Sequence, residues 1–192
     1  MIQPISKTVI LSVLLLPAAG VATAADPIFT VYMSPDGSDG NSGKNEKEPV
    51  RSLFRVQQVL VQNNPATDVE VRIKGGTYVA PPMRCEQSPE ECWRFYVPGR
   101  TISFMPIDYE YGEGRGGIAE LPVFRNARNP DGTYPAGFWF QPRLPTDKNH
   151  PLYGGGASGL RFYYLQVEYY SSGGVSIYGD SERDIGDESY DP

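Results

Sequence analysis

The segment from Val31 to Tyr78 constrains the fold of this chain more than any other part. It reads as a short apolar strand, a polar loop rich in glycine, an amphipathic helix, and a strand that ends in a Gly-Thr-Tyr turn. The helix is predicted over Pro49–Gln62, because apolar residues recur there every three or four positions. One helix set among short strands excludes a helical bundle and indicates a chain dominated by β-structure.

Short strands separated by turns are predicted along the rest of the chain. Each is an apolar or alternating run bounded by Gly, Pro or Asn. The 21 glycines and 18 prolines supply the many turns that such a chain requires. One turn is predicted at Gly75–Gly76. The predicted strands are Phe29–Met33, Val69–Ile73, Trp93–Val97, Thr101–Met105, Pro122–Phe124 and Gly137–Phe140.

The segment Gly159–Gly179 carries an alternation whose phase changes once. Leu160 and Phe162 alternate with more polar neighbours, and Leu165 and Val167 then continue the pattern one residue out of step. A slip in a period of two moves the apolar side chains to the other face, which in a flat sheet would be a fault or a bulge. We therefore expect the chain to turn a corner here, from one sheet to the next.

Val31–Tyr78 and Gly159–Gly179 resemble the opening and one coil of secreted right-handed parallel β-helix proteins, the group that includes pectate-lyase-like enzymes. The resemblance implies an all-β fold, a right-handed parallel β-helix of two to three irregular coils with an N-terminal capping α-helix. It also implies a polysaccharide-directed protein, similar to the N-terminal part of a pectate-lyase-like lyase or glycosidase. The alternatives are a non-catalytic carbohydrate-binding or cell-surface β-helix module, and an inactive truncated product.

Lyases of this group generally use a Lys or Arg as base on an acidic sugar whose carboxylate is neutralised by calcium or by basic residues. No position of this chain matches such a motif, so no catalytic residue is predicted.

Residues 1–24 have the features of a secretory signal peptide. Lys7 precedes the nine-residue apolar run Thr8–Leu16, which is too short to span a bilayer, and Ala22-Thr23-Ala24 fits a cleavage site. We expect a secreted or periplasmic protein that has no membrane span after cleavage. Residues 25–192 are then a single domain, expected to be a monomer. Because the polar residues 181–192 carry no capping signal, we expect the domain to be incomplete at its C-terminal end.

The net charge of the chain excludes one class of partner. The full sequence carries −6, and removal of residues 1–24 with their single Lys7 and no acidic residue leaves −7. An acidic domain is a poor match for nucleic acid, whose phosphates require basic patches. The expected partner, implied by the resemblance, is a polysaccharide with acidic sugars.

Aromatic residues near one arginine are the best candidates for sugar binding. Arg161 can pair with a uronate carboxylate, and Tyr163, Tyr169 and Trp139 can stack on sugar rings. The alternative is an aromatic ladder that only packs or shields the sheet.

Two further groups of residues have both a ligand-binding and a structural interpretation. Asp36, Asp39 and Asn41 offer the oxygen ligands that Ca²⁺ prefers, although a solvated turn uses the same residues. Cys85 and Cys92 are predicted to form a disulfide in an exported protein. A redox or metal pair is the alternative for the two cysteines, although their spacing is not Cys-x-x-Cys.

Overall fold

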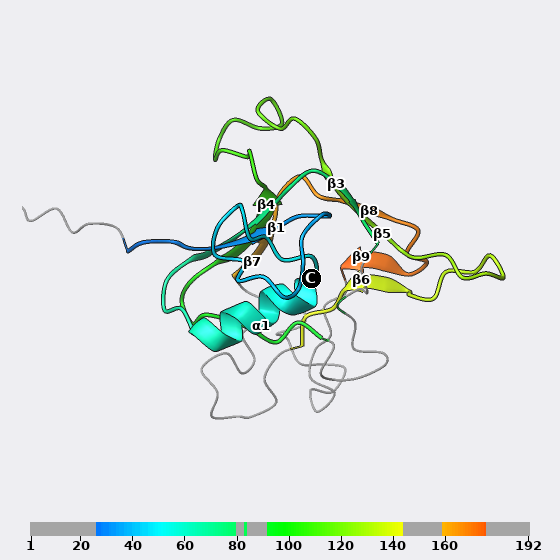
Figure 1. Cartoon of the computed structure of the whole chain (residues 1–192), viewed down its shortest axis with the longest axis horizontal. Helices are drawn as coiled ribbons and strands as arrows, with labels where there is room; N and C mark the ends of the chain where they lie inside the picture. The colour runs from blue at the N-terminus through cyan, green and yellow to red at the C-terminus, as the bar shows by residue number, and fades with distance from the viewer. Residues whose placement is uncertain (1–25, 80–82, 84–91, 144–158, 176–192) are drawn as a thin grey trace, which may run out of the picture.

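The computed structural model describes residues 26–79, 83, 92–143 and 159–175. This part of the chain is mostly β-structure with one helix (Figure 1). The signal peptide predicted over residues 1–24 and the terminal residues 181–192 lie outside the described residues. None of the helical structure in the described ranges has the length and apolarity that a bilayer crossing requires. The elements in chain order are β1 (Phe29–Met33), α1 (Leu53–Asn63), β2 (Val69–Ile73), β3 (Gly76–Tyr78), β4 (Ile102–Pro106), β5 (Pro122–Arg125), β6 (Phe138–Phe140), β7 (Leu160–Phe162), β8 (Gln166–Glu168) and β9 (Gly173–Val175).

The strands form three sheets in which all neighbours run parallel. The sheets have the orders β1-β2-β4-β7, β3-β5-β8 and β6-β9. From β4 onward the chain visits the three sheets in turn, as β4, β5 and β6 and then β7, β8 and β9. The corner predicted from the phase slip is confirmed, because β7 and β8 belong to different sheets. Tyr164 stands between them with a φ of 49°, a left-handed conformation at the corner between the two sheets.

The core is built from side chains that stack in register between parallel strands. Val31, Val71, Phe104 and Phe162 occupy matching positions on the four strands of the first sheet. The rings of Phe104 and Phe162 are stacked with centroids 5.0 Å apart. Such ladders bury apolar surface from one strand to the next, which is the main stabilising term in the folded chain.

The open edge of β1 is covered by the loop that follows it. Tyr32 N donates a hydrogen bond to Gly43 O at 2.8 Å, and Val50 N donates to Tyr32 O at 2.9 Å. Gly43 has a φ of +70°, and an added Cβ would lie 2.9 Å from Val50 Cγ1, so a glycine is required there. Helix α1 packs its apolar side into the same core and lies against β1. Loop and helix together protect an edge that would otherwise invite strand pairing.

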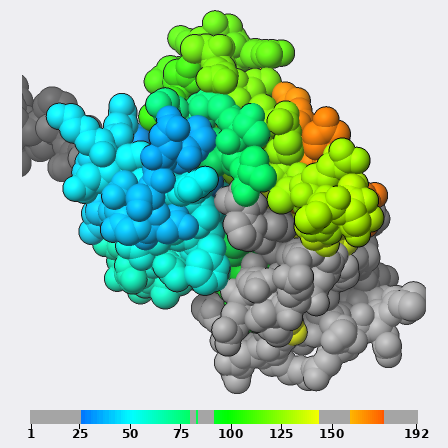
Figure 2. Space-filling view, turned by 45° about the vertical axis from the view of Figure 1, so that its right-hand side comes forward, coloured from blue at the N-terminus to red at the C-terminus, as the bar shows by residue number. Residues whose placement is uncertain are grey.

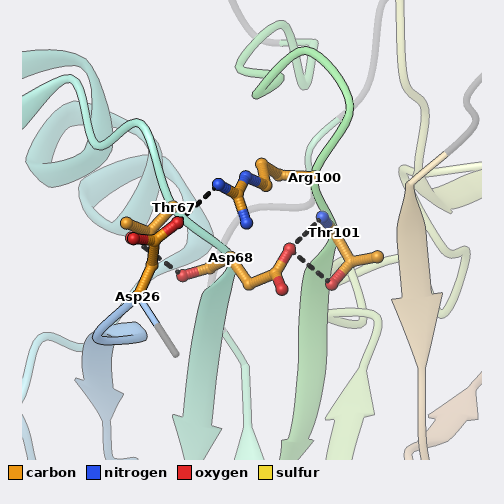
Figure 3. A network of polar contacts seen from close by, with 5 residues as sticks. All are labelled: Asp26, Thr67, Asp68, Arg100 and Thr101. Atoms are coloured by element: carbon orange, nitrogen blue, oxygen red, sulfur yellow. Dashed lines mark hydrogen bonds and ion pairs between the residues drawn. The ribbon is translucent and has the colours of Figure 1, made fainter. Parts of the chain in front are cut away.

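Polar contacts join the places where three strands of the first sheet begin (Figure 3). Asp68 Oδ1, just before β2, accepts a hydrogen bond at 2.8 Å from the backbone N–H of Thr101, just before β4. Arg100 pairs with Asp26, ahead of β1, at 2.6 Å. These contacts help to fix the register of β1, β2 and β4, although the exposed Arg100–Asp26 pair contributes little free energy.

Some element boundaries differ from the sequence predictions. The helix begins at Leu53 and not at Pro49, because Ser52 is its N-cap and accepts a hydrogen bond from Arg55 N. The predicted turn at Gly75–Gly76 runs directly into β3. Trp93–Val97 is not a strand, since the segment makes only an isolated bridge at Trp93.

Candidate functional site

The face of the first sheet opposite the core gathers polar side chains from neighbouring strands. Thr30, Glu70, Ser103 and Arg161 occupy matching positions on β1, β2, β4 and β7. Because side chains alternate along a strand, these residues lie on the face opposite the core ladder. The parallel register therefore aligns one residue of each strand in a row across the sheet.

Glu70 and Arg72 form an ion pair on this face. The Arg72 Nη2–Glu70 Oε2 distance is 2.7 Å, and the two side chains are 15% and 8% exposed. Arg72 Nη1 also donates a hydrogen bond to the carbonyl of Tyr109. Each charge of the pair therefore has a partner of opposite sign. The bond from Arg72 to the Tyr109 carbonyl also anchors the segment that carries Tyr109 to the sheet.

That segment, residues 107–121, links β4 to β5 and brings tyrosine rings over the face; it is the green loop above β4 in Figure 1. The ring of Tyr109 stacks on Tyr163 with centroids 5.2 Å apart, and Tyr111 meets Tyr163 edge-on at 5.7 Å. Burial raises the pKa of Tyr111, and the Glu70 carboxylate adds to the rise, although Ser103 acts in the opposite direction. The phenol of Tyr111 is therefore protonated at neutral pH and can donate a hydrogen bond.

Arg161 is the exposed cation of this face. It stands beside Ser103 in the register of β4 and β7, and no ion pair or hydrogen bond joins its side chain to another residue of the described ranges. Arg161 on β7 and Tyr163 just after it, both predicted from the sequence as sugar-binding residues, lie two residues apart along the chain. We call this surface the Arg161 face; it consists of Glu70, Arg72, Ser103, Tyr109, Tyr111, Arg161 and Tyr163.

Glu70, Arg72, Tyr109 and Tyr111 were not predicted as site residues. The alternation Val-Glu-Val-Arg-Ile in β2 is a signal that places Glu70 and Arg72 side by side away from the core. Nothing in the sequence of the 107–121 loop shows that it lies over this face.

The other predicted sugar-binding residues lie elsewhere. Tyr169 follows β8 in the second sheet, where its ring stacks on Tyr134. Trp139 belongs to the core and not to a surface, because it is 2% exposed and packs on Phe124 with centroids 4.5 Å apart. The predicted aromatic group is therefore divided among two surfaces and the interior.

The residues predicted to bind Ca²⁺ have structural partners instead. Asp39 Oδ1 accepts hydrogen bonds from the backbone N–H groups of Arg51 and Ser52, both at 2.9 Å, and its Oδ2 accepts from Ser52 Oγ at 2.7 Å. Asn41 Nδ2 donates to a backbone carbonyl, and Asp36 pairs loosely with a lysine. In the described ranges, no group of three or more His, Cys, Asp or Glu residues is arranged to hold a metal. Asp39 thus acts as an anchor for the start of α1.

The disulfide stays a prediction. Cys92 is fully buried, and Cys85 lies outside the described residues.

Comparison with known proteins gives limited matches. No family model and no curated protein matches the chain. Among solved structures, a rhamnogalacturonan lyase is 22% identical with a TM-score of 0.43, over 72% of this chain and 28% of its own. A glycoside hydrolase is 18% identical with a TM-score of 0.35, over 50% of this chain and 15% of its own. Both are partial likenesses, so the proposal below is built on the residues of this chain.

Proposed function

We propose that this chain binds an acidic polysaccharide through the Arg161 face. The observation that carries the proposal is an exposed arginine, without an ion partner in the described ranges, beside a cluster of tyrosine rings. A guanidinium can pair with a uronate carboxylate through two hydrogen bonds, and tyrosines offer both a ring and a hydroxyl to the sugar. The neighbouring Arg72 does not compete for the ligand, because Glu70 and Tyr109 occupy it.

The acidic side chains around this face limit the strength of binding. The 107–121 loop carries Glu110, Glu113 and Glu120, which are exposed. Attraction of the ligand therefore depends on short-range pairing with Arg161, because the loop provides no broad positive field. We expect weak binding that salt reduces, and a preference for one carboxylate at a defined position of the sugar chain.

The test is a calorimetric titration with trigalacturonate. Arg161→Gln should lower the affinity about tenfold, the effect of losing a hydrogen bond to a charged group. Arg51→Gln is the matched control, because Arg51 is an exposed arginine just before α1. Equal binding by wild type and Arg161→Gln would show that the Arg161 face is not the site. A rise in ultraviolet absorbance when polygalacturonate is added would show lyase activity, whereas binding without this change favours a non-catalytic module.

The fold proposed for this function is a right-handed parallel β-helix. Its support is the rotation of the chain through three parallel sheets, together with the strong preference of parallel crossovers for the right hand. In this interpretation α1 and the loop after β1 form the cap at the first coil. An experimental structure in which the crossovers were left-handed would contradict it.

We also propose that the protein is exported by cleavage of residues 1–24 and acts as a monomer outside the cytoplasm. The support is the apolar run before the Ala22-Thr23-Ala24 site. The mature protein should begin at Ala25 or Asp26 when its N-terminus is sequenced, and it should elute as a monomer. Recovery of an intact Met1 would contradict the proposal.

A further inference from the structure

A second surface lies where the chain leaves β8. The rings of Tyr134 and Tyr169 are parallel within 2°, with centroids 5.1 Å apart, and are 37% and 55% exposed. Tyr134 comes from the loop between β5 and β6, the yellow-green projection in Figure 2, and Tyr169 from the orange segment beside it. Two flat apolar rings are thus held together in contact with solvent.

The polar side chains beside these rings together carry no net charge. Arg125 and Glu168 face each other across β5 and β8, and Arg125 Nε lies 2.7 Å from Glu168 Oε2. The other oxygen of Glu168 accepts a hydrogen bond from Gln166 at 2.7 Å. The guanidinium of Arg125 lies 5.8 Å from the centre of the Tyr169 ring. The surface therefore offers hydrogen-bond donors and acceptors without a net charge.

The tyrosine stack is not what holds the loop in place. Asn126, which is buried, donates from Nδ2 to the carbonyls of Ala136 and Tyr169 at 2.7 and 3.0 Å, and so closes the base of the loop. Within the loop, Asn129 N donates to Thr133 O at 2.8 Å. Since backbone and amide contacts already fix both ends, the exposed rings are a preformed platform.

The backbone conformation of Tyr169 sets the position of its ring. Its φ of 64° is a left-handed conformation that a residue with a side chain adopts at a cost, and the bond from Asn126 maintains it. This conformation places the ring beside Tyr134 and Arg125.

We propose that Tyr134, Tyr169, Arg125, Glu168 and Gln166 form a binding surface for a neutral hexopyranose unit of a polysaccharide. The apolar face of the sugar stacks on the face of the Tyr134 ring that Tyr169 leaves open, and its hydroxyls bond to Glu168, Gln166 and Arg125. The inference extends the proposed function, because it adds a neutral subsite to a chain whose Arg161 face takes an acidic sugar. The surface disfavours a uronate, because the carboxylate of Glu168 already neutralises Arg125.

Titrations of the full chain with cellohexaose, β-1,4-galactotetraose and trigalacturonate test the proposal. Wild type should bind a neutral oligosaccharide, and Tyr134→Ala should weaken that binding about five- to tenfold, the effect of losing one aromatic contact. Tyr134→Phe should keep it. Phe54→Ala is the control, because Phe54 is an exposed aromatic residue of α1 that belongs to neither surface.

The outcomes of the two proposals are separable. Unchanged trigalacturonate binding by Tyr134→Ala would show that the variant is folded and that only the neutral subsite is lost. The inference is overturned if wild type binds neither neutral oligosaccharide, or if Tyr134→Ala binds them like wild type. Loss of trigalacturonate binding in Arg161→Gln with neutral binding intact supports both proposals. If the wild-type protein binds a neutral oligosaccharide but does not bind trigalacturonate, only the proposed function is overturned.

Discussion

Two surfaces of this molecule place an arginine near tyrosine rings, and they differ in what neutralises the arginine. On the Arg161 face the acidic side chain of the sheet, Glu70, is paired with Arg72, so Arg161 keeps an uncompensated charge among the described residues. On the second surface Glu168 stands directly across from Arg125 and neutralises it. The register of the strands thus decides which arginine is available to an anionic ligand.

This difference shows how one repeated architecture can present two kinds of site. In a stack of parallel strands, an outward residue meets its counterpart on the neighbouring strand. Ser103 beside Arg161 leaves a charge free, whereas Glu168 beside Arg125 removes one.

Trp139→Ala should lower the stability of the fold and, through it, sugar binding at both surfaces. The indole lies in the core, where it contacts Phe124 of the second sheet and Phe162 of the first. Removal of a buried tryptophan is expected to cost about 3–5 kcal/mol of unfolding free energy. Chemical denaturation measures this change. A variant of wild-type stability that has lost sugar binding would instead support the surface role predicted from sequence.

Glu70→Ala should destabilise the protein by roughly 2–3 kcal/mol, because it leaves the mostly buried Arg72 without its carboxylate. The effect should extend to the Arg161 face, since Arg72 also holds the Tyr109 carbonyl. The double variant Glu70→Met/Arg72→Met should recover part of the stability in denaturation experiments, because it removes the unpaired charge but also the hydrogen bond to the Tyr109 carbonyl. A double variant no more stable than Glu70→Ala would contradict this explanation.

Glu168→Gln should leave the second surface with an uncompensated arginine, as on the Arg161 face, and so allow it to bind an acidic sugar. Arg125 loses its charge partner but keeps its place over the tyrosine ring. We expect a several-fold gain in trigalacturonate affinity, which Arg161→Gln would not remove. The measurement is a titration of the double variant Arg161→Gln/Glu168→Gln, with Glu46→Gln, the same change at an exposed residue of the loop after β1, as control. No gain would mean that the pairing of Arg125 does not set the specificity.

Asp131→Asn should slightly lower the local stability of the loop between β5 and β6, which carries Tyr134 of the second surface. Hydrogen bonds from the Thr133 hydroxyl and backbone N–H lower the pKa of Asp131 below its ordinary value of 3.8. A lowered folded-state pKa contributes stability above pH 3.8 that is lost as the pH falls through the folded-state value. Hydrogen exchange of the loop amides should therefore differ between wild type and variant at pH 7, and the difference should shrink as the pH falls below 3.8. A difference that stays constant as Asp131 is protonated would contradict this linkage.

The sequence predicted the fold better than the site. The bounds of β1 and β2 follow from their apolar pattern, and the corner between β7 and β8 follows from a change of phase. Tyr109 and Tyr111 could not be predicted, since their position depends on how the loop between β4 and β5 lies across the sheet. Trp139 was placed on the surface because an aromatic side chain carries no sign of which way it points, and only the packing of the three sheets decides that.

The central claim is that acidic and neutral sugars bind at different surfaces. It is tested most directly by mapping, on isotope-labelled protein, which backbone amide chemical shifts change when each sugar is added. Trigalacturonate should shift the amides of Ser103, Arg161 and Tyr163, and a neutral oligosaccharide should shift those of Arg125, Tyr134 and Tyr169. Two separate sets of shifted residues would support two sites distinguished by charge. Shifts of one common set by both sugars, or shifts confined to other parts of the chain, would contradict the account.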